Sequence, residues 1–368
     1  DPGMKRWLCG ALAALMALTT GCSAILNRDY TSVTPHSATP QADGESNTIR
    51  VGSYQELVNA LIYLIGRGTE GGAIRFDGGD SDETAIQQML DEACLEVVQE
   101  DPLGAYAVEY IKYSVTPIVG SYEANVQITY RRTREQVAAI VDATGTAAIR
   151  SELSEALSEF SSEVVLRISY FEEDSEYIRQ LMREAYLSNP ASALDFPDAQ
   201  ITMYPETGQR RIVEVLLTYH QSRQTLESRR NSLQREADRL LTQAGVQGGE
   251  DALSQLVRLV RQTCSYQEGS GSTAYDALLE GTADSQGMAL ALALLCQRTQ
   301  PVLSCTVVDG QWNGVSHLWN VVQTAGGYRH VDLTQSGEVV FRTDQEMAAA
   351  GYTWDSERVP VCAAEEET

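Results

Sequence analysis

The chain has 368 residues, of which 43% are hydrophobic, and a formal net charge of −24. That apolar content in a chain of this length predicts packed cores in two or three domains. The negative charge repels phosphate backbones and bare anionic lipid, so we expect no nucleic acid partner. The sequence has no Cys-x-x-Cys pair and no cluster of cysteine with histidine. We therefore expect neither a structural metal nor a cofactor.

Residues 4–21 have the pattern of a secretory signal peptide. Two basic residues precede the apolar run WLCGALAALMAL, which is too short to span a bilayer comfortably. Gly21 and Cys22 then resemble the cleavage box of bacterial lipoproteins, in which the cysteine receives the lipid, although Thr19 stands where an aliphatic residue is usual. The resemblance implies an extracytoplasmic protein anchored to the bacterial cell membrane through lipidated Cys22. An ordinary signal peptide with an incidental cysteine is the alternative.

The segment after the predicted cleavage site, residues 22–49, differs in composition from the rest of the chain. It is rich in Ser, Thr, Pro and Asp, and its apolar residues follow no period. Such a composition is typical of a flexible linker, here between the lipid and the first folded segment.

Residues 50–222 show the same succession of patterns twice. In residues 50–135 the helical stretches VGSYQELVNALIYLIG and DETAIQQMLDEACLEVVQ alternate with a strand, and two more strands follow. Residues 146–222 have the same order, and Tyr130 and Tyr219 hold corresponding places in the two copies. We predict a duplicated α-β-α-β-β module. Because neither copy clusters catalytic residue types, we expect a binding or spacer element.

Three glycines in the first copy, Gly66, Gly68 and Gly71, have the spacing G-x-G-x-x-G. In nucleotide-binding proteins this motif follows a strand and precedes a helix, so that backbone amides and the helix N-terminus face the phosphate. Here a helical pattern precedes the glycines and a strand pattern follows them. This order predicts a turn and not a nucleotide site.

The stretch GTADSQGMALAL, residues 281–292, predicts a helix that begins at Ser285 after a glycine turn. With the residues before it, this stretch resembles the nucleophile segment of bacterial transglutaminase-like proteins. Ser285 stands where that family has its nucleophilic cysteine, and Met288 replaces the usual aromatic residue. The matching positions are Tyr275, Ala277, Leu278, Gly281, Gly287 and Ala289.

Two further motifs of that family follow in the family's order. SHLWNVV matches a His-x-Trp-Asn strand at His317 and Asn320, and YRHVDLT matches a strand that ends in Val-Asp-x-Thr, at Asp332. The C-terminal residues resemble the family's tail. The resemblance covers about residues 225–366, and three ordered motifs are far more specific than one.

The resemblance implies an α+β fold in which the duplicated module precedes a papain-like, transglutaminase-like domain. Its nucleophile helix packs on an antiparallel sheet that carries His317 and Asp332 on adjacent strands. In the family, the histidine takes the thiol proton and the aspartate orients the ring. The resemblance places Tyr275 near the nucleophile, where its hydroxyl helps to hold an oxyanion.

Serine at position 285 leaves the chemistry open. A thiol with a pKa of about 8.5 ionises beside a histidinium, whereas a hydroxyl does not. One hypothesis is a catalytically inactive domain that binds a ligand, protein or peptide in its cleft. The other is a working Ser285–His317–Asp332 triad for acyl transfer or hydrolysis of peptide amides or esters. A third reading is that Ser285 was introduced to inactivate an enzyme. The sequence leaves the substrate, the binding partner and the oligomeric state open.

Three other residues near these motifs are weaker candidates. His330, two residues before Asp332, is an alternative base, although we expect an ordinary surface histidine there. Cys296 lies on the same helix as Ser285, roughly 16 Å further along, and therefore cannot replace it. Cys305 lies on a predicted strand, where we expect a small buried residue.

Overall fold

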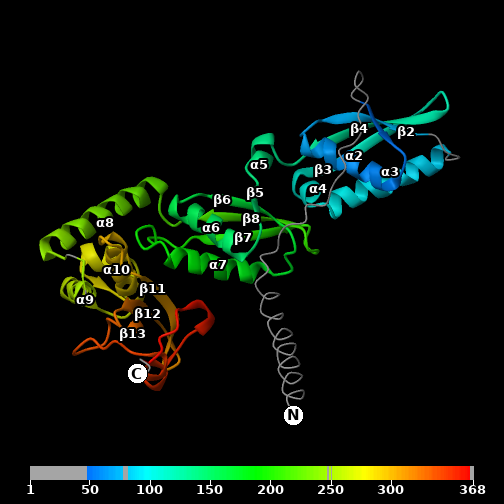
Figure 1. The fold of residues 1–368 in the computed structure, drawn as a ribbon. Coiled ribbons are helices and arrows are strands. Elements are labelled where there is room, and N and C mark those ends of the chain that lie inside the picture. Colours follow the sequence, from blue (N-terminus) through cyan, green and yellow to red (C-terminus); the bar gives the residue numbers. More distant parts are fainter. Residues whose placement is uncertain (1–47, 78–81, 247, 250, 365–368) are drawn as a thin grey trace, which may run out of the picture. The chain divides into compact units, whose positions relative to one another are not determined.

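The computed structural model describes residues 48–77, 82–246, 248–249 and 251–364 (Figure 1). The predicted signal peptide, Cys22 and the predicted linker up to residue 47 lie outside the described residues. Within the described part, no helix combines the length and the hydropathy that a bilayer crossing requires.

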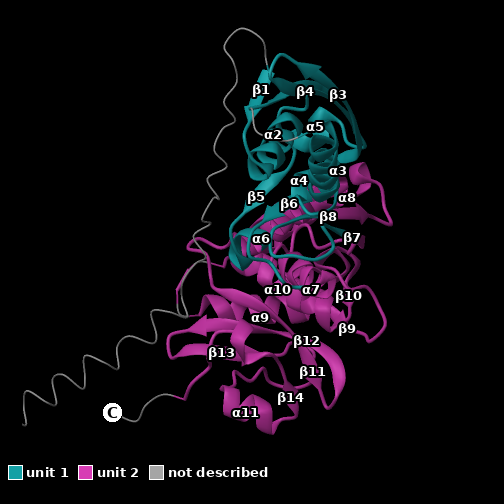
Figure 2. Ribbon diagram, turned by 90° about the vertical axis from the view of Figure 1, so that its right-hand side faces the viewer, with its two compact units in different colours: residues 1–149, 165–173, 201–214 teal, residues 150–164, 174–200, 215–368 magenta. Residues whose placement is uncertain are grey.

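The chain divides into two compact units (Figure 2). The first unit contains the described residues between 48 and 149 together with 165–173 and 201–214, drawn in teal. The second unit, in magenta, contains residues 150–164, 174–200 and the described residues between 215 and 364. The division passes through the second of the two predicted repeats.

The first predicted repeat forms a four-stranded sheet in the order β1-β2-β4-β3. Strand β1 (Thr48–Val51) runs parallel to β2 (Gly71–Phe76), and β4 (Ser121–Tyr130) runs antiparallel to both β2 and β3 (Val108–Ile118). The helices of this segment are α2 (Tyr54–Gly66), α3 (Glu83–Gln99), α4 (Pro102–Ala107) and α5 (Arg134–Ala138).

Helix α2 shows why this segment folds as it does. The Ser53 hydroxyl accepts a hydrogen bond from the Glu56 amide and so caps the helix N-terminus. Leu57, Leu61 and Leu64 then recur at helical spacing, and all three are buried in the core that includes the sheet. Each such side chain contributes about 1.5–3 kcal/mol by leaving water.

The next segment has the same order of elements except that it lacks a counterpart of α4. Its four-stranded sheet has the order β5-β6-β8-β7, with β5 parallel to β6. The two sheets therefore share their strand order, while their origin in a duplication stays a prediction. The elements are β5 (Val141–Ala143), α6 (Thr146–Ser158), β6 (Glu163–Ile168), α7 (Ser175–Leu187), β7 (Asp198–Tyr204) and β8 (Arg211–Thr218).

The predicted α-β-α-β-β pattern lacked the first strand of each segment. Strands β1 and β5 have only four and three residues, too few to show an alternating pattern. As a result, the predicted linker ran two residues too far. Thr48 and Ile49 are buried in β1, where Ile49 is part of the core.

The C-terminal part of the second unit is an antiparallel sheet covered by helices. The sheet order is β13-β12-β11-β14, and β12 pairs antiparallel with both β11 and β13. The strands are β11 (Cys305–Trp312), β12 (Val315–Thr324), β13 (Gly327–Val331) and β14 (Tyr352–Thr353). The helices are α8 (Arg223–Ala244), α9 (Ala252–Thr263), α10 (Ser285–Arg298) and α11 (Asp344–Ala349). The fold is α+β, as the sequence predicts.

Shorter elements complete this part: the strand pair β9 (Ser265–Tyr266) and β10 (Thr282–Ala283), the π-helical turn η1 (Asp276–Glu280) and the 3₁₀ turn η2 (Ser356–Arg358).

Helix α10 lies at the centre and packs against β11, β12, α8 and α9. Its residues 287–296 are all buried. An apolar sequence around the whole helix is what a helix with neighbours on every side requires.

Candidate functional site

Ser285 is the first residue of α10, as the sequence predicts. The side chain of Asp284 caps the helix by accepting a hydrogen bond from the Gly287 amide at 3.0 Å. The Ser272 hydroxyl in turn donates to the Asp284 carboxylate. The start of the helix is therefore fixed by two hydrogen bonds to one carboxylate.

Gly287 lets the chain pass close to this helix start. A Cβ at position 287 would lie 2.7 Å from the Cβ of Ala283 and 2.9 Å from the carbonyl oxygen of Thr273. Both distances are shorter than carbon contacts allow, so a larger residue would displace the loop. The glycine thus positions Ser285 relative to the loop at residues 271–273.

His317 and Asp332 form a buried hydrogen-bonded pair. His317 lies on β12, and Asp332 directly follows β13, the neighbouring strand. Nε2 of His317 and Oδ2 of Asp332 are 2.8 Å apart. The exposed fractions of the two residues are 6% and 4%. The structure therefore brings these two predicted residues together in the antiparallel sheet.

Asp332 receives hydrogen bonds from several more groups. The Tyr352 hydroxyl donates to Oδ2 at 2.7 Å, and the amide and hydroxyl of Thr334 donate to Oδ1 at 3.0 and 2.8 Å. Burial opposes ionisation of this carboxyl, but the hydrogen bond and charge of His317, with the bonds from Tyr352 and Thr334, outweigh it. Together they lower the pKa of Asp332 to about 2. Asp332 is therefore ionised at neutral pH.

Aromatic rings surround the imidazole of His317. The ring centroids of Trp312, Tyr352 and Trp319 lie 5.7, 6.1 and 6.4 Å from the centroid of the imidazole. Trp312 is held in place because its indole N–H donates to the carbonyl of Ala350 at 3.1 Å. These contacts leave the histidine ring little freedom to turn away from Asp332.

The Ser285 hydroxyl lies beside this pair but is not bonded to it. Its Oγ accepts a hydrogen bond from the Leu318 amide at 3.2 Å. Leu318 directly follows His317, so the hydroxyl lies against β12 next to the histidine. Among the described residues, however, no hydrogen bond joins Ser285 to His317, and the bonds of the imidazole to Asp332 and Thr334 both use Nε2. The structure therefore shows no direct hydrogen bond between the Ser285 hydroxyl and the imidazole that would act as its base.

The side chain of Tyr275 contacts an arginine of α8. The Arg229 guanidinium lies over its ring, 5.2 Å from the centroid. Tyr275 immediately precedes η1, and this turn carries it towards α8, where Arg229 lies. Among the described residues, no hydrogen bond joins the Tyr275 hydroxyl to Ser285. The oxyanion role of Tyr275 stays a prediction.

Sequence reasoning missed two tyrosines of the site. Tyr352 carries the hydroxyl that binds Asp332, but it comes from a short strand whose position no motif indicated. Tyr266, in β9, pairs with Ala283 of β10, two residues before Ser285. Burial and the charges of Glu268, Asp332 and Asp284 raise the pKa of its phenol. Tyr266 thus lies close to the carboxylates of the site, although the spacing of the sequence gives no sign of it.

The cysteines near the site do not replace the missing thiol. Cys296 is fully buried within α10. Cys305, half-buried at the start of β11, is hydrogen-bonded to the Cys296 thiol and accepts a hydrogen bond from the Asn320 side chain at 3.3 Å. The contact with Cys296, together with burial, holds the pKa of the Cys305 thiol well above its ordinary value. This thiol is therefore protonated at neutral pH, and unreactive.

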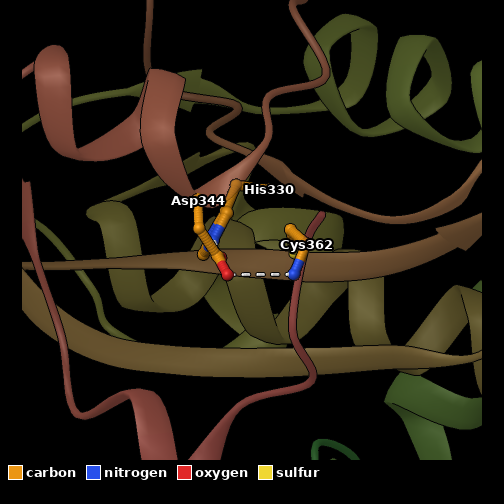
Figure 3. A group of neighbouring side chains, drawn as sticks. All are labelled: His330, Asp344 and Cys362. Atoms are coloured by element: carbon orange, nitrogen blue, oxygen red, sulfur yellow. Dashed lines mark hydrogen bonds and ion pairs between the residues drawn. The ribbon is translucent and has the colours of Figure 1, made fainter. Parts of the chain in front are cut away.

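The structure corrects the expectation that His330 is a surface histidine. Its exposed fraction is 0%, because β13 turns this face towards the aromatic core. Its Nδ1 accepts a hydrogen bond from the Trp319 indole at 2.9 Å, and its Nε2 lies 2.8 Å from Oδ1 of Asp344. Figure 3 shows His330, Asp344 and Cys362 side by side, with the Cys362 amide bonded to Asp344.

The possible metal ligands of these three residues lie within 4.8 Å of one another. They do not fit a metal. The Trp319 N–H uses Nδ1 of His330 as an acceptor, so Nε2 carries the proton of the neutral ring and donates it to Asp344. Burial and the neighbouring Asp344 raise the pKa of Cys362 to about 12, so its thiol keeps its proton within this hydrogen-bonded group. The group is a hydrogen-bonded part of the core.

Comparisons with known proteins give little further information. No protein family model matches the chain, and no curated protein matches it. One similar solved structure is described as the crystal structure of a TGase. The match covers 62% of this chain and 67% of that chain, at 12% identity and a TM-score of 0.26. A TM-score of this size carries no argument. The case for a transglutaminase-like domain therefore depends on the ordered motifs and on the geometry around His317.

Proposed function

We propose that residues 225–366 form a transglutaminase-like domain that has lost acyl transfer and serves as a binding module for a protein or peptide. The observation that carries this proposal is the position of the Ser285 hydroxyl, which accepts a hydrogen bond from the Leu318 amide instead of engaging His317.

An active serine requires a link between its hydroxyl and a base. Its proton must pass to a base as the oxygen attacks, so hydroxyl and imidazole must be within about 2.6–3.2 Å of each other or share one water. Nε2 of His317 faces Asp332, which leaves Nδ1 to act as the base. In the described residues, Nδ1 is not bonded to Ser285. A thiolate would have avoided this requirement by ionising before the substrate binds.

The pair of His317 and Asp332 has a reason to persist without catalysis. Asp332 is a buried ionised carboxylate that satisfies donors from His317, Tyr352 and Thr334. Removing any member would leave a buried polar group without a partner, at a cost of about 1–3 kcal/mol. The pair therefore supports the sheet whether or not a reaction takes place.

The half-buried Trp312 and the exposed Tyr266 support a binding role for the same region. Trp312 stacks on Tyr352 at 5.6 Å and lies beside His317, and Tyr266 is 41% exposed beside β10. Aromatic side chains that combine an apolar face with a polar tip are typical of surfaces that bind protein segments. Together with Ser285, these residues offer both apolar and hydrogen-bonding contacts to a peptide.

A serine-directed fluorophosphonate probe tests the loss of activity. We expect the native full-length chain to show no more labelling at residue 285 than Ser285→Ala, read by mass spectrometry of the peptide that contains the residue. Labelling of the native protein that disappears in both Ser285→Ala and His317→Gln would contradict the proposal. The glutamine at 317 is chosen because its amide still donates a hydrogen bond to Asp332.

The second candidate function is an active serine hydrolase or acyltransferase of peptide amides or esters. One observation favours it: the orienting half of a triad, His317 with Asp332, is complete. The same probe decides between the two functions, since only an activated hydroxyl reacts in a manner that depends on His317.

We also propose that the protein is a bacterial lipoprotein, held at the outer side of the cell membrane by lipid on Cys22. The signal-peptide pattern of residues 4–21 and the Gly21-Cys22 pair support this proposal. Metabolic labelling with a clickable fatty acid should mark the protein, and Cys22→Ala should abolish the label. Label that persists in the variant would refute the assignment.

A further inference from the structure

The first unit contains a pocket whose charged lining is entirely basic. Its volume is about 480 Å³, and its lining comes from the turn after α2, the segment from β4 into α5, and the adjoining strand β6. The charged lining residues are Arg67, Arg132, Arg134 and Arg167. The apolar lining includes Ile65, Leu103 and Val137.

This lining departs from the composition of the chain, which has 51 acidic and 27 basic residues. Two of the arginines have carboxylate partners, Arg132 with Glu214 at 3.1 Å and Arg167 with Asp142 at 3.6 Å. Within the described residues, Arg67 and Arg134 form no ion pair. Glu135 follows Arg134 but is exposed and outside the lining. The pocket therefore keeps an excess of positive charge.

The glycine turn identified in the sequence shapes one wall of this pocket. Gly68 has a φ of 63°, a left-handed conformation that favours glycine. Its carbonyl accepts a hydrogen bond from the Arg134 guanidinium at 3.2 Å, and a Cβ at 68 would lie 3.3 Å from the Arg134 side chain. The Arg67 guanidinium is bonded to the Tyr63 hydroxyl at 3.0 Å. Both guanidinium groups are thus positioned by uncharged partners.

Arg132 is held in the wall of the pocket by contacts with two tyrosines. Its guanidinium lies over the Tyr106 ring, 4.7 Å from the centroid, and bonds the Tyr204 hydroxyl at 3.1 Å. Among the described residues its Nε has no hydrogen-bond partner, but this atom is buried and is therefore not exposed to a ligand in the pocket. Arg132 thus forms part of the pocket wall and is not counted as a donor to the ligand.

We propose that this pocket binds a small organic oxyanion: a phosphate or carboxylate group attached to an apolar body. Guanidinium groups bind both kinds of oxyanion through paired N–H donors, and no carboxylate of the described residues forms an ion pair with Arg67 or Arg134. The apolar lining receives the body of the ligand. The volume is within the range of about 300–1,000 Å³ that small-molecule sites occupy.

Isothermal titration of the full chain with phenyl phosphate, benzoate and inorganic phosphate tests the site. We expect phenyl phosphate to bind more tightly than inorganic phosphate, because its ring adds apolar contact. Tighter binding of benzoate than of phenyl phosphate would identify the ligand as a carboxylate, and the reverse order as a phosphate. No binding of any of the three at millimolar concentration would overturn the proposal.

Three variants and one control assign the binding to this pocket. Arg67→Gln and Arg134→Gln should each weaken the binding of the tighter probe by about tenfold, since each removes a charge-assisted hydrogen bond. Arg134→Lys should lose less, because it keeps the charge. Arg235→Gln, an exposed change of the same charge on α8, should leave the affinity unchanged. Equal weakening by all three glutamine variants would show nonspecific binding of anions and overturn the proposal.

Discussion

The helix side and the sheet side of the candidate site differ in how strongly the fold holds them. On the sheet side, Asp332 is bonded to His317, Tyr352 and Thr334, and aromatic rings enclose the histidine. On the helix side, the Ser285 hydroxyl has one hydrogen bond within the described residues, to the Leu318 amide. The residue that would carry the reaction and the residues that stabilise the fold are therefore different ones at this site. A change at residue 285 removes a nucleophile at little structural cost, whereas a change at Asp332 disturbs the core.

The largest expected effect is at Asp332. Asp332→Ala would leave the His317 imidazole and the Tyr352 hydroxyl without their acceptor, and we expect a loss of about 3–5 kcal/mol in the free energy of unfolding. Urea denaturation measures it. Asp251→Ala is the matched control, because Asp251 is exposed and its side chain makes no cap hydrogen bond. Equal stability of the two variants would contradict the conclusion that the fold depends on the sheet side of the site.

Gly287→Ala should come next. The added methyl group would meet Ala283 and the Thr273 carbonyl, and such overpacking costs about 1–3 kcal/mol. The same denaturation experiment detects it. Gly145→Ala is a suitable control, since a Cβ at 145 meets nothing within 4 Å. Equal stability of the two variants would show that residue 287 does not pack closely against Ala283 and Thr273.

The low pKa of Asp332 predicts a loss of stability in acid. Because its pKa is about 2 in the folded state and about 3.9 when unfolded, the unfolded chain binds the extra proton between these values. The carboxylate therefore contributes roughly 2 kcal/mol above pH 4, and this contribution disappears as the pH falls to about 2. Denaturation of native protein and Asp332→Asn at several pH values should show their difference shrinking in that range. A difference that stays constant would contradict it.

The smallest effect should be at Ser285 itself. Ser285→Ala removes a single hydrogen bond to the Leu318 amide, which is worth about 1 kcal/mol. Thermal unfolding should show only a slight decrease in Tm. A loss as large as that of Asp332→Ala would mean that the hydroxyl is a structural element of the core.

Much of the site could be predicted because its residues lie in motifs that follow one another in a recognisable order. A glycine turn before small and apolar residues indicated where α10 begins, and His317 and Asp332 were indicated by the resemblance. The two tyrosines could not be found in this way, since Tyr352 and Tyr266 reach the site through pairings of very short strands. Burial of His330 was missed because its partners Trp319 and Asp344 come from other elements.

The same limit explains the errors in the fold. Long helices and strands were evident from their periodicity, whereas β1 and β5 become strands only by pairing with β2 and β6. Such short segments depend on tertiary contacts that local patterns do not encode. Likewise, the left-handed glycine turn could be placed, but the arginines that it meets come from later segments.

The reactivity of a cysteine at position 285 tests the central claim most directly. If the site kept its geometry and lost only its sulfur, Ser285→Cys should react with iodoacetamide with a midpoint well below pH 8, because His317 and the helix N-terminus favour the thiolate. Adding His317→Gln should move that midpoint towards the ordinary value of about 8.5. A midpoint near 8.5 that does not respond to His317→Gln would contradict the account, since it would show that His317 does not act on residue 285.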